Sequence, residues 1–251
     1  MSNEVLLRAE GLRKSFGGVT AVNDVSFEIK RGEILGVIGP NGSGKTTLVN
    51  LISGFIKPDA GEVHFEGKKI TGLPPHKIAN LGLARTFQIP RPYHLPSYKN
   101  LIVPLRSPRA RRSSWGKLGD RFSLAIDLLE EVGFERDAYV PYKIASSLPE
   151  GYLKRLELAR CLSLRPELII ADEILSGLSM AEMATMTPLV EKLQMQGMTI
   201  IMIEHRLREL FSLCSRVIVM NFGVKIAEGV PEEVMATKKV KEAYLGKEIK
   251  E

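Results

Sequence analysis

The chain has 251 residues, and its 44% hydrophobic and 25% charged content is that of an ordinary globular protein rather than a disordered one. Its 35 basic and 29 acidic residues give a formal net charge of +6, which alone fits a nucleic acid, an anionic membrane surface or no charged partner. Apolar runs such as 168–171 are too short to span a membrane, the N-terminus has no signal-peptide core, and Cys161 and Cys214 follow no metal or redox spacing. We therefore expect a cytoplasmic protein with reduced thiols.

The first part of the chain alternates strands with turns and then changes to a loop and a helix. Residues 5–9 and 25–29 have the pattern of early strands, and the apolar run 34–38 predicts a buried strand. Residues 47–52 predict the start of a helix, and 62–65 a further short strand. A glycine-rich loop therefore lies between a buried strand and a helix.

This loop fits the phosphate-binding pattern G-x-x-x-x-G-K-[ST], the P-loop or Walker A motif. Its residues are Gly39, Pro40, Asn41, Gly42, Ser43, Gly44, Lys45 and Thr46, and Thr47 follows at the helix start. Glycines allow successive backbone N–H groups to point at phosphate oxygens, beside the positive end of a helix. Lys45 can reach the β- and γ-phosphates, and the Thr46 hydroxyl can bind Mg²⁺. The motif predicts a nucleoside triphosphate with Mg²⁺ as the ligand.

After Gln88 the character of the sequence changes, because prolines interrupt regular structure. The later elements that we expect are helices at 124–132 and 152–164 and a hairpin of strands at 217–220 and 225–228. We predict an α/β domain whose core, about 1–88 and 165–251, is interrupted by a mostly helical subdomain at about 89–164.

Two further strand ends carry chemistry. The apolar strand 168–171 is followed by Asp172 and Glu173, the Walker B pattern, in which Asp172 holds the Mg²⁺ shell and Glu173 orients water or accepts its proton. The alternative is that both residues are ordinary solvated acids at a strand end. A P-loop upstream makes this alternative less favoured than the Walker B assignment. The apolar strand 199–203 is followed by His205, which can contact the γ-phosphate. Glu173 and His205 are therefore the expected catalytic residues.

Together these motifs resemble the ATP-binding-cassette ATPases along nearly the whole chain. The resemblance implies a P-loop NTPase (RecA-like) parallel-sheet core with an antiparallel β subdomain and an inserted helical subdomain. It implies that Phe16 stacks on adenine with Val22 nearby, and that Gln88 touches Mg²⁺ and couples to a transporter. It also implies that His205 is the switch histidine and that residues 176–179 form the D-loop, ending in Ser179 where an acid or asparagine is common.

The segment that matches the family signature Leu-Ser-Gly-Gly-Gln departs from it. The residues here are Leu148, Pro149, Glu150, Gly151 and Tyr152. Leu148 and Gly151 are retained as expected nucleotide contacts. Pro149 has no N–H to donate, and Glu150 beside phosphates is unfavourable unless it points away. We therefore expect weaker hydrolysis at the site that this segment completes in a partner cassette.

Within the family, the strongest resemblance is to the ATPase subunits of branched-chain amino-acid importers. Residues 16–22, 72–79, 82–88 and 203–207 carry it, with the ending 243–246. It implies an ATP-hydrolysing subunit, peripheral on the inner face of the cell membrane. The implied partners are membrane permeases, a second cassette in a hetero- or homodimer, and, indirectly, a solute-binding protein.

Three alternatives remain open at this point. One is the ATPase subunit of a urea or amide importer, which has a similar sequence. The second is a soluble cassette acting on ribosomes or DNA, although such proteins usually carry two cassettes or a long coiled coil. The third is a regulatory cassette that binds ATP without turnover, which the altered signature supports.

A basic segment at 106–121 is the other unassigned feature. It is expected to be a solvated loop or else a contact for lipid headgroups or an acidic partner. No interleaved pattern of aromatic residues in it suggests stacking on bases, so we expect no nucleic-acid partner.

Overall fold

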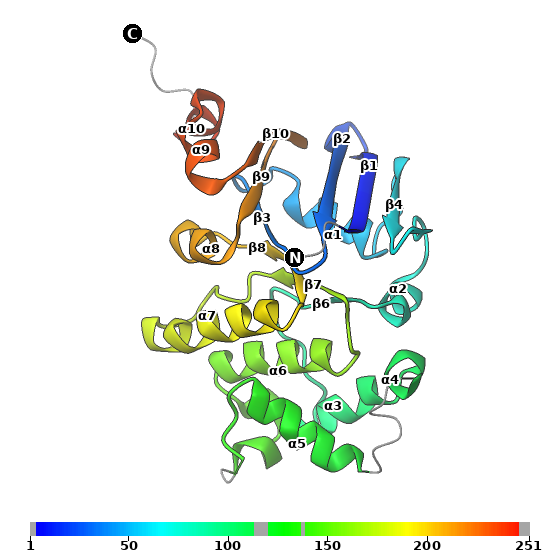
Figure 1. The fold of residues 1–251 in the computed structure, drawn as a ribbon, viewed down its shortest axis with the longest axis vertical. Helices are drawn as coiled ribbons and strands as arrows, with labels where there is room; N and C mark the ends of the chain where they lie inside the picture. The colour runs from blue at the N-terminus through cyan, green and yellow to red at the C-terminus, as the bar shows by residue number, and fades with distance from the viewer. Residues whose placement is uncertain (1–3, 113–119, 137–138, 246–251) are drawn as a thin grey trace. The chain divides into compact units, whose positions relative to one another are not determined.

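The computed structural model describes residues 4–112, 120–136 and 139–245, which fall into two compact units (Figure 1). The first unit comprises Met1–Pro75 and Gln194–Glu251, and the second comprises His76–Leu193. The helical subdomain that we expected at about 89–164 lies inside the second unit. That unit is wider than expected because it also holds two strands and the helices beside them.

An antiparallel sheet forms one part of the first unit. Its strand order is β2-β1-β4-β5, with β1 at Val5–Phe16, β2 at Val19–Lys30, β4 at Ala60–Phe65 and β5 at Lys68–Lys69. Alternate residues of β2, namely Val25, Phe27 and Ile29, are buried, as expected for a sheet with one face against a core. The strands predicted at 5–9 and 25–29 are therefore confirmed, and both are longer than predicted.

A second sheet of the first unit has the order β10-β9-β3-β8. The strands are β3 (Ile34–Ile38), β8 (Thr199–Ile203), β9 (Arg216–Asn221) and β10 (Val224–Gly229). Strand β3 pairs in parallel with β8 and β9, whereas β9 and β10 form the predicted antiparallel hairpin. Every residue of β3 and β8 is buried, which explains their continuous apolar sequences.

The described residues of the first unit also form the helices α1 (Lys45–Ile52), α8 (Leu207–Leu213), α9 (Pro231–Ala236) and α10 (Lys238–Leu245). Helix α8 packs on β3 at Gly36, where a Cβ would lie 3.3 Å from Leu210 Cδ2 of the helix and 2.7 Å from Val217 Cγ1 of β9. Because β3 leads directly into the P-loop, this close packing fixes the strand that carries the loop.

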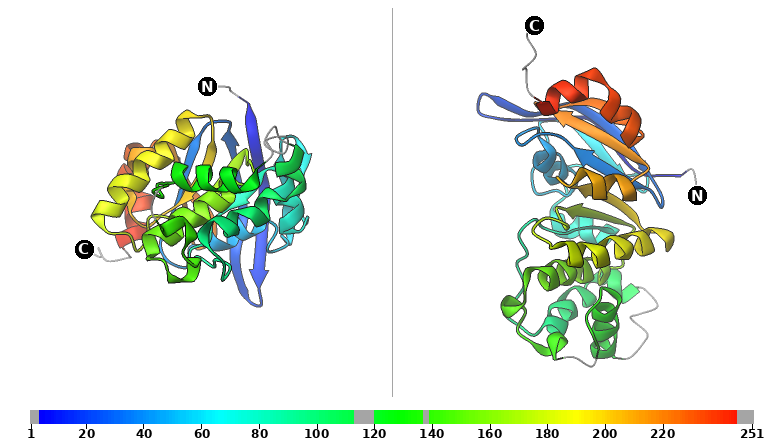
Figure 2. Two further views of the ribbon diagram at one scale, coloured as in Figure 1. Left: turned by 90° about the horizontal axis from the view of Figure 1, so that it is seen from below. Right: turned by 90° about the vertical axis from the view of Figure 1, so that its left-hand side faces the viewer.

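The second unit is mainly helical. It contains α2 (Pro75–Leu81), α3 (Ser97–Leu105), α4 (Pro108–Arg112), α5 (Arg121–Glu131), α6 (Glu150–Leu162) and α7 (Met180–Met195). Helices α3, α5 and α6 pack against one another (Figures 1 and 2). Strands β6 (Leu83–Arg85) and β7 (Leu168–Asp172) pair in parallel, which places Arg85 opposite Ile170.

Candidate functional site

The backbone of the P-loop in the first unit requires glycine. Gly39, Gly42 and Gly44 have positive φ angles of 149°, 76° and 105°. A Cβ on Gly39 would lie 2.1 Å from the Met220 carbonyl oxygen, and one on Gly44 would lie 2.3 Å from that of Ala21. Glycine is therefore set by conformation at all three positions, and by space as well at Gly39 and Gly44, as the phosphate-binding pattern predicts.

The loop also carries groups suited to phosphate. Lys45 is only 6% exposed, and its Nζ donates hydrogen bonds to the carbonyl oxygens of Gly39 at 2.7 Å and Pro40 at 3.0 Å. The buried Oγ of Ser43 has no hydrogen-bond partner among the described residues. Helix α1 has neither a side-chain cap nor an acid in its first turn. A free hydroxyl, an ammonium group and an uncapped helix N-terminus together fit a bound triphosphate.

The C-terminal helix reaches this loop, which the sequence did not predict. The hydroxyl of Tyr244, on α10, lies near the backbone of Gly39. Burial raises the pKa of Tyr244 to about 12, so its hydroxyl is neutral at physiological pH. The end of the described chain thus lies beside the first glycine of the P-loop.

The other expected residues of the first unit differ in accessibility. Phe16, at the end of β1, is 48% exposed, with Lys14 Nζ 5.6 Å from its ring centroid. Val22 is fully buried, so of the two residues expected beside adenine only Phe16 offers an open surface. His205 follows β8 and is exposed, as are Asn41 and Thr46.

Asp172 in the second unit is buried and held from two directions. Its Oδ2 lies 2.8 Å from Nη2 of Arg85, and both side chains are only 6% exposed. The Thr86 hydroxyl accepts a hydrogen bond from the backbone N–H of Asp172 at 3.0 Å. Sequence reasoning missed Arg85 and Thr86. The parallel pairing of β6 and β7 brings Arg85 and Thr86 beside the Walker B strand. No local sequence motif predicts that pairing.

Glu173 adopts a left-handed backbone conformation, with φ 53°, that non-glycine residues rarely take. Its Oε2 accepts a hydrogen bond of 2.8 Å from Nε2 of Gln88, so the structure brings these two expected site residues together. Nζ of Lys154, on α6, donates to the backbone carbonyls of Gln88 at 2.7 Å and Glu173 at 2.8 Å. Sequence reasoning missed Lys154 as well.

The signature segment begins helix α6, with Pro149 at its N-cap and no side-chain cap. Glu150 is exposed and its carboxylate lies beside Gly177, where an added Cβ would be 2.4 Å from Glu150 Oε1. A Cβ on Gly151 would lie 2.2 Å from Glu182 Oε1. Gly151, the glycine retained in the signature, therefore leaves room for the side chain of Glu182 on α7. Leu148, the other retained residue, is buried.

Ser179 and Glu182 form a reciprocal cap at the start of α7. The backbone N–H and the hydroxyl of Ser179 donate to Glu182 Oε2 at 2.9 and 2.8 Å, and the N–H of Glu182 donates to Ser179 Oγ at 3.3 Å. These bonds hold the pKa of Glu182 below its ordinary value. A capping box thus explains the serine that replaces an acid or asparagine at the end of the D-loop.

The basic segment is in part helical, so the expectation of a loop is wrong for residues 108–112, which form α4. Arg109 donates to the carbonyl oxygens of Arg165 and Leu81 and pairs with Glu167. Its role in the second unit is therefore structural. Residues 113–119, including Lys117, lie outside the described residues.

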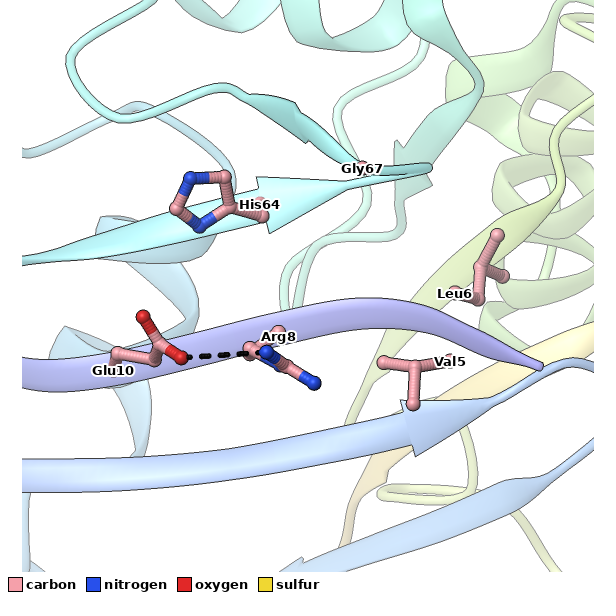
Figure 3. Close-up of a pocket in the computed structure, with 6 residues that line it drawn as sticks. All are labelled: Val5, Leu6, Arg8, Glu10, His64 and Gly67. Atoms are coloured by element: carbon pink, nitrogen blue, oxygen red, sulfur yellow. Dashed lines mark ion pairs between the residues drawn. The ribbon is translucent and has the colours of Figure 1, made fainter. Parts of the chain in front are cut away.

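A hollow of about 350 Å³ lies on the antiparallel sheet of the first unit (Figure 3). It is lined by Val5, Leu6, Arg8, Glu10, His64 and Gly67. Arg8 is already paired with Glu10 at 3.7 Å and with Glu28 at 2.5 Å. None of the residues predicted for the nucleotide lines this hollow, so it does not belong to the candidate site.

Within the described ranges, no group of three histidine, cysteine or acidic side chains could by itself hold a metal ion. No helix in the described part of the chain is both long enough and apolar enough to cross a bilayer.

Comparison with known families gives two matches. The model described as "ABC transporter" matches residues 22–176. The model described as "Branched-chain amino acid ATP-binding cassette transporter" matches residues 224–250.

Two curated relatives illustrate the similarity along the chain. The high-affinity branched-chain amino acid transport ATP-binding protein BraF of Pseudomonas aeruginosa is 34% identical over 256 residues, covering 96% of this chain and 98% of BraF. The probable branched-chain amino acid transport ATP-binding protein LivG of Archaeoglobus fulgidus is 36% identical over 245 residues, covering 96% of this chain and 95% of LivG.

Solved structures share the fold. A nucleotide-free ATP-binding cassette from an ABC transporter matches with a TM-score of 0.85 and 32% identity, covering 97% of this chain and 100% of that one. The ADP conformation of MJ1267, an ATP-binding cassette of an ABC transporter, matches with a TM-score of 0.83 and 33% identity. This match covers 98% of this chain and 100% of that one. The fold class predicted from the sequence is thereby confirmed.

Proposed function

Because the chain belongs to the ABC transporter family, we propose that it is the ATP-hydrolysing subunit of an importer for branched-chain amino acids. The observation that carries the proposal is the near full-length similarity to branched-chain amino acid transport ATP-binding proteins, at 34–36% identity. The match at 224–250 favours this solute class over urea or amides. The presence of Lys45, Asp172, Glu173 and His205 favours a catalytic cassette over a regulatory one.

ATP binding is the task of the first unit in this proposal. The backbone N–H groups of the P-loop, the Ser43 hydroxyl and Lys45 bind the phosphates, and Phe16 stacks on adenine. Thr46, Asp172 and Gln88 are the residues that would hold Mg²⁺, which neutralises charge on the β- and γ-phosphate oxygens when bound.

Hydrolysis depends on Glu173. Its carboxylate orients a water molecule, whose oxygen forms a bond to the γ-phosphorus as the bond to the bridging oxygen of ADP breaks. Glu173 takes the proton that the water loses, and His205 contacts the γ-phosphate. Lys45 stays beside the phosphates and offsets the charge that develops on the leaving ADP.

The second unit offers a surface for membrane partners. Apolar side chains are exposed after Gln88, including Ile89 at 68% and Val103 at 48%. Exposed apolar side chains of this kind are available for contact with a protein partner. We assign them to permease subunits at the inner face of the membrane, with a second cassette completing the assembly.

The test is reconstitution of the chain with neighbouring permease, cassette and binding-protein subunits in liposomes. We expect ATP-dependent uptake of labelled leucine and an ATPase rate stimulated by the permeases and the loaded binding protein. Uptake of urea in place of leucine would favour the amide importers. An ATPase rate that is equally fast without permeases would show an uncoupled, soluble enzyme.

A further inference from the structure

Lys154 is an unusual residue for the interior of the second unit. It is only 2% exposed, although lysine is rarely buried unless its charge is well satisfied. Its Nζ donates to two carbonyl oxygens from segments distant in the sequence, those of Gln88 at 2.7 Å and Glu173 at 2.8 Å. A buried cation with such partners holds two loops together.

The two carbonyls belong to residues whose side chains are also joined. Nε2 of Gln88 donates to Oε2 of Glu173 at 2.8 Å. Lys154, Gln88 and Glu173 therefore form a closed ring of three contacts, two through the backbone and one through side chains. Such a ring restrains both the position of the Glu173 backbone and the direction of its carboxylate.

Glu173 needs such a restraint. Its φ of 53° is a left-handed conformation that is unfavourable for a non-glycine residue, and it persists only where its surroundings fix it. The ammonium group of Lys154 holds the carbonyl of this same residue. The carboxylate expected to orient the attacking water therefore depends on a lysine from another helix.

We propose that Lys154 is a positioning residue for hydrolysis, which fixes Glu173 and Gln88 in the arrangement that orients water. The inference rests on the proposed function. Lys154 lies one helical turn after Glu150 and Gly151, so the helix that begins with the signature also sets the catalytic carboxylate. A shift of α6 at its N-terminus is then transmitted to Glu173 through one side chain.

The matched control is Arg155, the next residue of α6. Its Nη1 donates to the carbonyl of Val132 at 2.6 Å, and its Nη2 bonds to Thr185, away from Glu173. Both Lys154→Met and Arg155→Met remove a cation that bonds a backbone carbonyl. Only Lys154→Met removes a contact to Glu173, the residue whose carboxylate is expected to orient the water.

We expect Lys154→Met to lower kcat of the reconstituted transporter by roughly 10–100-fold, the scale of a small misplacement of a reacting group. KM for ATP should stay within about twofold, because the P-loop is untouched. Arg155→Met should leave kcat within about twofold, whatever it does to the melting temperature. Lys154→Arg should restore part of the lost kcat, since a cation returns.

Lys154→Met could lower kcat simply because the variant is less stable than the parent protein. A double-mutant cycle with Glu173→Gln separates that cause from a positioning role. In a Glu173→Gln background, where the base is gone, adding Lys154→Met should lower kcat by less than about threefold. The positioning role would be overturned if Lys154→Met lowered kcat by the same factor in that background as in the parent. Equal losses of kcat in Lys154→Met and Arg155→Met would overturn it too. Absence of ATPase activity in the parent transporter would instead refute the proposed function.

Discussion

The P-loop of the first unit and the acid segment of the second unit are built in opposite ways. The contacts of the loop's lysine are local, because Lys45 bonds to Gly39 and Pro40, six and five residues away. The acid segment is assembled from distant residues: Arg85 and Asp172 are 87 positions apart, and Gln88 and Glu173 are 85 apart. A motif in consecutive residues can therefore specify the loop, whereas the acids acquire their partners only through the fold.

This difference predicts that the acid segment is the more sensitive to loss of a remote residue. Arg85→Met leaves Asp172 buried without its cation, which should lower the free energy of unfolding by about 3–5 kcal/mol. Arg136→Met is the control, because Arg136 pairs with Asp127 at an exposed site, 47% and 56% open, and should cost about 0–1 kcal/mol. Urea unfolding measures both. Equal losses of unfolding free energy in the two variants would contradict a larger role for the buried pair of Arg85 and Asp172.

The P-loop should instead be sensitive to a single added methyl group. Gly39→Ala places a Cβ against the Met220 carbonyl, so the loop must shift and its aligned N–H donors are lost. We expect ATP affinity to fall about 100-fold, as for the loss of one or two charge-assisted hydrogen bonds. Gly67→Ala is the control, since Gly67 also has positive φ, 69°, but nothing lies within 4 Å of its added Cβ. If equilibrium binding of ATP shows both variants unchanged, the loop does not need its glycine shape.

Loss of the P-loop cation should have an effect on ATP binding of similar size. Lys45→Met removes a charge-assisted contact worth roughly 1.5–3 kcal/mol, or about 10–150-fold in Kd for ATP. Lys69→Met, which removes an exposed lysine paired with Glu62, should leave Kd within about twofold. Titration with a fluorescent ATP analogue separates the two. An unchanged Kd for Lys45→Met would remove Lys45 from the phosphate site.

The smallest effect concerns pH. Burial raises the pKa of Cys214 from 9.0 to about 12, and that of Tyr244 from 10.0 to about 12. Because both pKa values are higher in the folded state, the unfolded chain releases these protons first. The contribution of these two groups to the free energy of unfolding should therefore be constant up to about pH 9 and fall as the pH rises toward 12. Cys214→Ala should reduce that fall in urea titrations, and identical profiles would contradict this account.

The sequence predicted the elements whose signals are local. Strands β3 and β8 have the predicted limits, because an uninterrupted apolar run marks a buried parallel strand. Helix α3 was missed, since Pro104 in its last turn and the prolines before it resembled a broken segment. Strand β6, only Leu83–Arg85, is too short to show a period of two.

The site divides in the same manner. The P-loop residues, Asp172 and Glu173 follow from motifs, and the contact of Gln88 with Glu173 fits the expected Q-loop. Lys154 and Arg85 carry no motif, because their partners are brought near only by the packing of α6 and the pairing of β6 with β7. The exposed position of Glu150 beside Gly177 likewise depended on the fold, although the sequence had raised the question of where its charge would point.

The most direct test of the account is a paired measurement on Glu173→Gln in the reconstituted transporter: equilibrium ATP binding and steady-state phosphate release. The amide keeps the size of the side chain and removes the base, so turnover should fall by about 10²–10⁴-fold. The Kd for ATP should stay within about twofold, because binding belongs to the P-loop. Unchanged phosphate release would contradict the assignment of hydrolysis to Glu173, and a comparable loss of binding would contradict the division of labour between the two units.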